Sequence, residues 1–194
     1  MQGYGTMANE AADQLRQCSV NRPTHVFVQA GVGSLAGAVV GYFANLFPND
    51  PPKFVVMEAG AADCLYQGAL ANDGKPRIVT GDLKTIMAGL ACGEPNTISW
   101  DILRNHVSAF ISCPDWVSAK GMRMLSSPVK GDPRVVSGES GAVGMGVLDA
   151  IMCDDTYKEL RDALELDRHS RVLMFSTEGN TCLLYTSDAA DDKA

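Results

Sequence analysis

Short apolar runs alternate with longer segments of helical periodicity along this chain of 194 residues. The apolar runs, typical of strands that are covered on both faces, lie at residues 25–30, 53–58, 77–80, 107–112 and 171–175. The segments that favour helices lie at residues 6–18, 35–47, 61–70, 114–125, 142–152 and 157–166. Because strands that alternate with helices pair through right-handed crossovers, we expect an α/β fold with a mostly parallel sheet and helices on both faces.

The first of these strand-to-helix turns has the composition of an anion site. It reads Gly31-Val32-Gly33-Ser34, and the expected helix begins at Leu35. Glycine adopts the positive φ of a tight turn, and without a Cβ it lets an anion approach the backbone. The first turn of the helix adds unpaired N–H groups and a partial positive charge. We therefore predict a cradle for a phosphate group at this turn.

Several ligands carry a phosphate that fits such a cradle, and they imply different functions. Gly31, Gly33 and Ala36 match the G-x-G-x-x-G/A fingerprint of dinucleotide-binding folds. Glu58 follows Gly33 by 25 residues, near the position of an acid that holds a ribose hydroxyl, although we interpret it as a surface acid ending a strand. An NAD-dependent oxidoreductase is therefore one interpretation. A pyridoxal phosphate enzyme is the second, and a non-catalytic small-molecule-binding domain is the third.

Five motifs separate these interpretations, and in chain order they are QGYGTMANEA (2–11), GVGSLAGAV (31–39), TIMAGLACGEPN (85–96), SGESGAVG (137–144) and FSTEGNT (175–181). Together they resemble the diaminopropionate ammonia-lyase family, which has the fold type II (tryptophan synthase β-like) architecture of pyridoxal phosphate enzymes. The resemblance covers about residues 1–181. It implies pyridoxal 5′-phosphate as cofactor, a small amino acid as substrate, and α,β-elimination of 2,3-diaminopropionate to pyruvate and ammonia. For the complete enzyme it implies a homodimer.

The resemblance also assigns the cofactor's phosphate to one segment of the chain. Backbone N–H groups in this segment, with the Ser34 hydroxyl, would hold the phosphate of the cofactor. The residues that match the phosphate loop of the family are Gly31, Val32, Gly33, Ser34 and Leu35.

Residues from three other motifs match positions around the cofactor ring. Ser176, or its neighbour Thr177, resembles the hydroxyl residue that faces the pyridine nitrogen. Glu139 aligns with a glutamate near the ring, although an acid that opens a helix is also favourable electrostatically. Gly89 either allows a close approach to the ring or is a packing glycine. Cys64 and Cys92 lie beside family motifs, as a pair or as free thiols.

The family's Schiff-base lysine has no counterpart in these motifs. In the family this lysine, and the aspartate that assists the chemistry, lie upstream of the segments found here. The lysines of this chain are Lys53, Lys75, Lys84, Lys120, Lys130, Lys158 and Lys193, and none lies in the lysine motif. We therefore name no catalytic residue and expect the chain to be inactive by itself.

The two parts of the chain have different expected origins. Residues 1–181 resemble the carboxyl-terminal part of the lyase. The tail that begins CLLYTSDAADD at Cys182 back-translates to a sequencing adapter, so we expect residues 182–194 to be non-native. We also expect that an incomplete α/β core leaves apolar residues 54–57 partly uncovered, which would make the chain prone to aggregation.

The composition of the chain limits which partners and which cellular location we expect for the protein. The formal net charge of −7 argues against a nucleic-acid partner. No apolar run is long enough to span a membrane. The six cysteines show neither a CxxC motif nor metal-ligand spacing with histidines, so we expect no metal, reduced thiols and a cytoplasmic protein.

Overall fold

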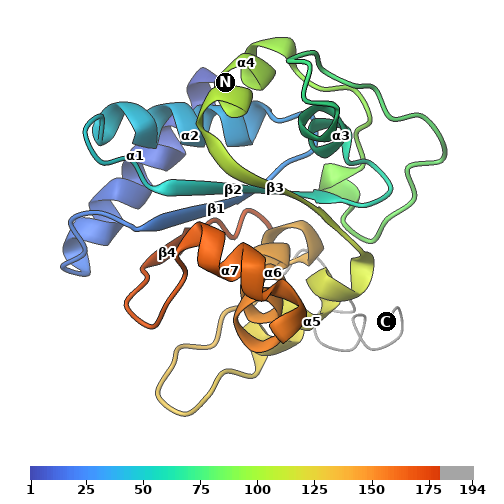
Figure 1. The fold of residues 1–194 in the computed structure, drawn as a ribbon. Helices are drawn as coiled ribbons and strands as arrows, with labels where there is room; N and C mark the ends of the chain where they lie inside the picture. Colours follow the sequence, from blue (N-terminus) through green and yellow to red (C-terminus); the bar gives the residue numbers. More distant parts are fainter. Residues whose placement is uncertain (180–194) are drawn as a thin grey trace.

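The computed structural model describes residues 1–179, and a parallel sheet of four strands forms its centre (Figure 1). The strands are β1 (His25–Gln29), β2 (Lys53–Ala59), β3 (Val107–Cys113) and β4 (Val172–Met174). Their spatial order is β3-β2-β1-β4, and every neighbouring pair is parallel. The expected mostly parallel sheet is confirmed, and the carboxyl ends of all four strands lie on one side of it.

Helices cover both faces of the sheet, as expected (Figure 1). They are α1 (Gln2–Gln17), α2 (Ser34–Leu46), α3 (Cys64–Ala71), α4 (Thr97–His106), α5 (Asp115–Ser126), α6 (Glu139–Cys153) and α7 (Lys158–Leu164). The first four helices lie on one face, and α5, α6 and α7 lie on the other. Two short 3-10 turns, Ala88–Leu90 and Asp155–Tyr157, complete the described elements.

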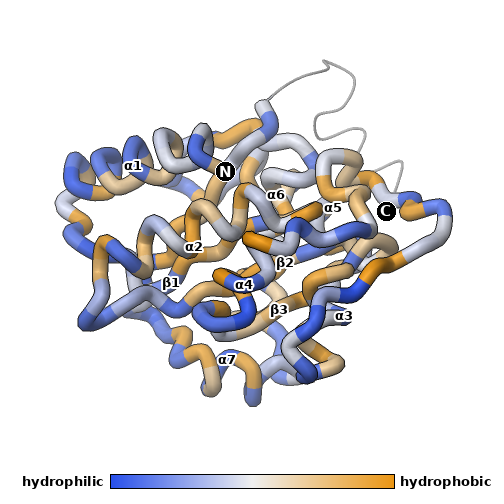
Figure 2. The backbone as a smooth tube through the Cα atoms, turned by 90° about the horizontal axis from the view of Figure 1, so that it is seen from above, coloured by the Kyte–Doolittle hydropathy of each residue, from blue (hydrophilic) through white to orange (hydrophobic). Residues whose placement is uncertain are grey.

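Successive side chains of the central strands enter two different hydrophobic cores, because a strand points alternate residues to opposite faces. Val26 and Phe54 pack with the helices of the first face, whereas Phe27 and Met57 pack with those of the second. All four side chains are at most 1% exposed. In Figure 2 hydrophobic and hydrophilic positions alternate around α1, which fits a helix that has one face on the core.

Residues 54–57 correct one expectation. We expected them to lack part of their cover, but Phe54 is 1% exposed and Val55, Val56 and Met57 are fully buried. Helices on both faces of the sheet already cover β2 within the described residues. The argument for aggregation from an uncovered β2 is therefore wrong.

Two further differences concern single elements. The expected strand at 77–80 is not a strand, although Val79 N donates to Gly93 O at 2.9 Å. Helix α4 was not expected; Asn96 caps it by accepting a hydrogen bond from Ser99 N at 2.9 Å.

The tail at 182–194, predicted to be non-native, lies outside the described residues.

Candidate functional site

The turn between β1 and α2 has the geometry that the glycine pattern predicts. Gly33 is the N-cap of α2 with φ +89° and ψ −1°, a left-handed conformation that favours glycine. Within the described residues, α2 has no side-chain cap and no acidic residue in its first turn. The first N–H groups of α2, from Ser34 onward, are therefore available to an anion.

Neighbouring segments hold this turn from behind. Val32 O accepts a hydrogen bond from Asn96 N at 2.7 Å. A Cβ on Gly31 would lie 3.3 Å from Leu90 Cα, and a Cβ on Gly33 would lie 3.2 Å from Leu65 Cδ1. Both positions are therefore too tight for a larger residue without movement of the neighbours. These contacts fit a phosphate cradle, because neighbouring segments hold the backbone of the turn in place.

The segment after β4 lies beside this cradle because β4 pairs with β1. Gln29 Nε2 donates to Phe175 O at 2.8 Å and to Thr177 Oγ1 at 2.9 Å. Ser176 Oγ donates to Ser137 Oγ at 2.9 Å, and the residue is exposed. Gln29 therefore engages the hydroxyl of Thr177, and Ser137 engages the hydroxyl of Ser176.

Gly89 lies between the glycine turn and the residues Ser140 and Glu178. A Cβ on Gly31 would lie 3.4 Å from Gly89 O, so the 3-10 turn at 88–90 crosses the glycine turn. A Cβ on Gly89 would in turn lie 3.1 Å from Ser140 Oγ and 3.0 Å from Glu178 Oε1. Four segments therefore meet at the carboxyl end of the sheet: the glycine turn, the turn at 88–90, the start of α6 and the residues after β4.

The carboxylate at the start of α6 comes from a residue that the sequence analysis did not select. Glu139 lies in the first turn of α6, as expected, and its main-chain oxygen accepts a hydrogen bond from Ser118 Oγ. Glu178 Oε2, however, accepts the hydrogen bond from Ser140 N at 2.7 Å. The signal was present, because Glu178 belongs to the same FSTEGNT motif as Ser176.

Ser140 supplies an atom that can be tested against a bound group. Its Oγ is buried and has no hydrogen-bond partner among the described residues. Buried hydroxyls are normally paired, so an unpaired one at the edge of a cradle fits a site that receives a polar ligand.

Glu58 corrects another interpretation. It is fully buried rather than on the surface, and its two oxygens accept hydrogen bonds from Leu65 N at 2.9 Å and Tyr66 N at 2.7 Å. Burial raises the pKa of this carboxyl from 4.5 to about 8, and the two N–H donors oppose that rise. Because both oxygens face the start of α3, they are not presented to a ribose hydroxyl.

The cysteines beside the site are free thiols. Cys64 Sγ donates toward Glu58 Oε1 and toward Cys92 O, each at 3.7 Å. Burial raises the pKa of the Cys64 thiol to about 12, so it is not an activated nucleophile. Within residues 1–179, no group of three His, Cys, Asp or Glu residues is placed to hold a metal ion. No helix in this part of the chain is long and apolar enough to cross a membrane.

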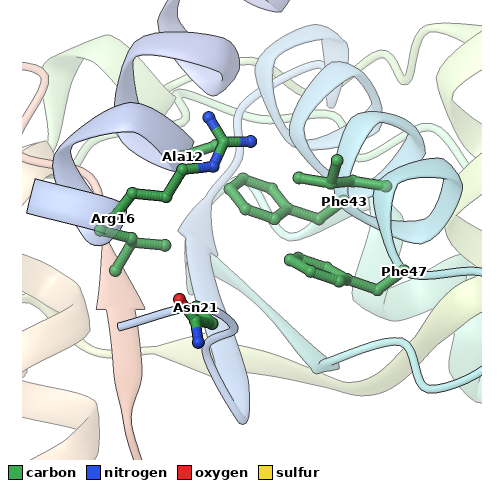
Figure 3. Close-up of a pocket in the computed structure, with 7 residues that line it drawn as sticks. Ala12, Arg16, Asn21, Phe43 and Phe47 are labelled. Atoms are coloured by element: carbon green, nitrogen blue, oxygen red, sulfur yellow. The ribbon is translucent and has the colours of Figure 1, made fainter. Parts of the chain in front are cut away.

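A pocket elsewhere on the molecule is separate from these segments (Figure 3). It lies between α1 and α2, has a volume of about 220 Å³, and contains the stacked rings of Phe43 and Phe47. The residues that line it are Ala12, Leu15, Arg16, Asn21, Phe43, Leu46 and Phe47. None of these residues belongs to the motifs that meet at the carboxyl end of the sheet.

Comparison with known proteins decides between the interpretations of the cradle. Residues 1–178 match the family described as pyridoxal-phosphate dependent enzyme. The chain belongs to this family. The family's cofactor is pyridoxal 5′-phosphate, which fits the cradle, and the dinucleotide-dependent oxidoreductase is not supported.

Relatives within the family are similar over nearly the whole chain. Diaminopropionate ammonia-lyase of Salmonella typhimurium is 51% identical over 182 residues, which are 93% of this chain and 45% of the relative. Diaminopropionate ammonia-lyase of Escherichia coli K12 is 49% identical over 181 residues, which are also 93% of this chain and 45% of the relative. The crystal structure of the Escherichia coli holoenzyme superposes with a TM-score of 0.88 at 45% identity and covers 100% of this chain and 47% of that one. The chain thus spans about 45% of the length of its curated relatives.

Proposed function

We propose that this chain forms part of a pyridoxal phosphate-dependent lyase that converts 2,3-diaminopropionate to pyruvate and ammonia by α,β-elimination. The observation that carries the proposal is the rigid glycine cradle, which meets three further segments at the carboxyl ends of the strands. About 50% identity to curated diaminopropionate ammonia-lyases supports this substrate. Residues 1–181 correspond in this proposal to the carboxyl-terminal part of the lyase, and residues 182–194 to a non-native tail.

The cradle would hold the phosphate of the cofactor. In this proposal the N–H groups of the turn and of the start of α2 donate to the phosphate oxygens, and the Ser34 hydroxyl adds a further donor. The phosphate-binding residues are Gly31, Val32, Gly33, Ser34 and Leu35. The uncapped start of α2 supports this assignment, since its partial positive charge favours an anion.

The hydroxyl of Ser176 would donate to the pyridine nitrogen, with Thr177 as its neighbour. For this contact the Ser176 proton would turn from Ser137 Oγ to the ring nitrogen, whereas Thr177 Oγ1 accepts from Gln29 Nε2 and keeps its own proton. A neutral hydroxyl donates to an unprotonated nitrogen, whereas a carboxylate would favour the protonated form. When bound, the cofactor supplies an electron sink for the reacting carbon of the substrate.

Two further residues complete the proposed contacts with the cofactor. Gly89 would allow the ring to approach the backbone closely, because it is exposed and lies against the glycine turn. Glu139, in the first turn of α6, would lie near the ring.

Other parts of the enzyme would supply the rest of the reaction. None of the four segments of the site contains a lysine, so the Schiff-base lysine would come from a region outside this chain. We propose that the complete enzyme is a homodimer. We also propose a cytoplasmic location, which the free thiols of Cys64 and Cys92 support.

A chimeric enzyme tests the function. The segment of the Salmonella typhimurium enzyme that matches this chain would be replaced by residues 1–181, and pyruvate formed from 2,3-diaminopropionate would be measured. We expect pyruvate formation with bound pyridoxal phosphate. A folded chimera that retains the cofactor but forms no pyruvate from this substrate would refute the proposed reaction.

A variant of the chimera tests the cradle separately. Gly33→Asp adds a side chain whose Cβ would lie 3.2 Å from Leu65 Cδ1, at a φ of +89° that disfavours any side chain, so it would distort the turn that is proposed to hold the phosphate. We expect this variant to lose its cofactor absorbance, whereas Gly5→Ala, at a position with nothing within 4 Å, keeps it. Full absorbance in Gly33→Asp would show that the phosphate lies elsewhere.

A further inference from the structure

Glu178 contacts two of the segments that form the site. Its side-chain Oε2 accepts a hydrogen bond from Ser140 N at 2.7 Å, and its main-chain oxygen accepts one from Gly138 N at 3.0 Å. Oε1 lies beside Gly89, on the turn that crosses the cradle. Glu178, in the segment after β4, thus connects the start of α6 with the turn at 88–90.

The glycines around Glu178 are needed for space. A Cβ on Gly138 would lie 2.8 Å from Glu178 Cβ and 2.9 Å from Oε2. Gly138 has φ −70° and ψ 176°, a conformation that any residue adopts, so backbone strain does not explain the glycine. A Cβ on Gly89 would lie 3.0 Å from Oε1. The surrounding chain is therefore shaped around this carboxylate.

The charge of Glu178 also suits its position. Helix α6 has 15 residues, and its unpaired N–H groups carry a partial positive charge at the N-terminus. A carboxylate that accepts one of these N–H groups forms a charge-assisted hydrogen bond. Glu178 forms no ion pair within the described residues, so the start of α6 is its main polar partner.

The same contacts of Glu178 also fix the position of Ser176. Ser176 Oγ donates to Ser137 Oγ at 2.9 Å and lies 3.5 Å from Glu178 O. Gly138 N holds this same main-chain oxygen of Glu178. The position of the Ser176 hydroxyl therefore depends on how the Glu178 residue is held against α6.

We propose that Glu178 is a positioning residue that fixes the Ser176 hydroxyl for the cofactor ring by clamping the segment after β4 onto the start of α6. This inference rests on the proposed function, because it assigns Ser176 to the ring. It predicts that loss of the clamp weakens contacts with the ring and leaves contacts with the phosphate unchanged.

Two probes separate these contacts in the full 194-residue chain. The first is 4′-deoxypyridoxine 5′-phosphate, which carries the ring and the phosphate but no aldehyde, so it needs no lysine. The second is inorganic phosphate, which reports on the cradle alone. Dissociation constants for both would be measured by calorimetry or by chemical-shift titration.

Glu178→Ala should weaken binding of the ring analogue about tenfold, the loss typical of one charge-assisted hydrogen bond, and leave phosphate binding within about twofold. Glu178→Gln keeps an oxygen for Ser140 N and should restore most of the affinity. Glu159→Gln is the matched control, because it removes an exposed acid from the first turn of α7, outside the four segments of the site, and should change neither constant.

A double-mutant cycle tests whether Glu178 acts through Ser176. In a Ser176→Ala background, Glu178→Ala should cause little further loss. Additive losses would overturn the positioning role. If Glu178→Ala does not fold, Gly138→Ala decides, because its methyl group displaces Glu178 and should produce the same selective loss.

The remaining outcomes are also decisive. Equal affinity of Glu178→Ala and the unmodified chain for the ring analogue would overturn the inference. Equal losses for the analogue and for phosphate would show general damage and would overturn it too. If the unmodified chain binds neither probe, the proposed cofactor site fails, and the role of Glu178 fails with it.

Discussion

Glu58 and Glu178 are acids whose oxygens accept backbone N–H groups at the starts of helices. Glu58 holds the first turn of α3, where Leu65 supports Gly33 of the cradle, and Glu178 holds the first turn of α6. Both acids therefore act on the site through the backbone. Because Glu58 is fully buried, its charge is costly, and this sets its response to pH.

Glu58→Gln should change how the stability of the chain depends on pH. Burial raises the pKa of Glu58 in the folded state to about 8, above its ordinary value of 4.5. The folded state therefore binds this proton more tightly, so its contribution to stability is present below pH 4.5 and is lost as pH rises through 8. We expect Glu58→Gln to gain stability relative to the unmodified chain between pH 6 and pH 9, measured by urea unfolding.

A second variant of the same chain serves as the control for this prediction. Glu159→Gln changes an exposed acid in the first turn of α7 and should leave the dependence between pH 6 and pH 9 largely intact. A Glu58→Gln chain with the same pH dependence as the unmodified one would show that Glu58 titrates normally.

Ser176→Ala in the chimeric enzyme should lower turnover more than cofactor affinity, because the phosphate cradle supplies most of the anchoring. Loss of one hydrogen bond to the ring nitrogen costs about 1–3 kcal/mol, or roughly tenfold to a hundredfold in rate if it is felt mainly in the transition state. Steady-state kinetics and cofactor titration would measure the two quantities. A loss of turnover in Thr177→Ala, with Ser176→Ala unchanged, would move the hydroxyl role to Thr177.

Helices α5 and α6 pack so closely that glycines are required where they meet. A Cβ on Gly121 would collide with Ala142 O, and a Cβ on Gly146 would collide with Val117 O. The start of α6 at the site is therefore fixed from two sides, by α5 and by Glu178. Gly121 and Gly146 thus serve the packing of α5 on α6.

Gly121→Ala should destabilise the chain by about 1–3 kcal/mol or more, because the added methyl group must push two helix backbones apart. Gly5→Ala in α1 is the control; it meets nothing within 4 Å and should add about 0.5–1 kcal/mol through its helix propensity. Urea unfolding of both variants measures the difference. A neutral Gly121→Ala would contradict the close packing of α5 on α6.

The elements that sequence could identify are those whose pattern is complete in the local segment. β1 and β2 are continuous apolar runs, and the turn at Gly33 needs a conformation that glycine favours. Helix α4 was missed although Asn96, which caps its start, is a residue type that favours this position. The segment at 77–80 has strand composition but exposes Ile78, so composition alone was misleading.

Only part of the candidate site could be predicted from the sequence. The glycine turn was predicted from its own composition, whereas the hydroxyl after β4 was predicted from the resemblance of FSTEGNT to the family. The burial of Glu58 and the clamp of Glu178 depend on contacts between distant segments, such as Glu178 with Ser140, and no local pattern contains them.

At the scale of the whole molecule, the described sheet has two edges, β3 and β4. The outer edge of β3 pairs with no other described strand, and Ser108 on it is exposed. Unpaired strand edges promote association between chains. Any tendency of the chain to aggregate is therefore expected at this edge rather than at the covered β2.

Ser108→Lys should reduce association of the chain, because a charge on an edge strand disfavours pairing with another edge. Sedimentation velocity at increasing concentration would measure it. Asn105→Lys adds the same charge to the exposed surface of α4 and should leave association unchanged. Equal association of Ser108→Lys and the unmodified chain would exclude the β3 edge as the contact.

The pairing of β1 with β4 has a consequence for synthesis on the ribosome. Thr24 and Arg171, which meet where these strands begin, are 147 residues apart. At about 5–20 residues per second, β1 leaves the ribosome roughly 7–30 s before its partner exists. During that interval the apolar edge of β1 and the half-built cradle stand open. The nascent chain is therefore expected to need protection by a chaperone at β1 until β4 has been made.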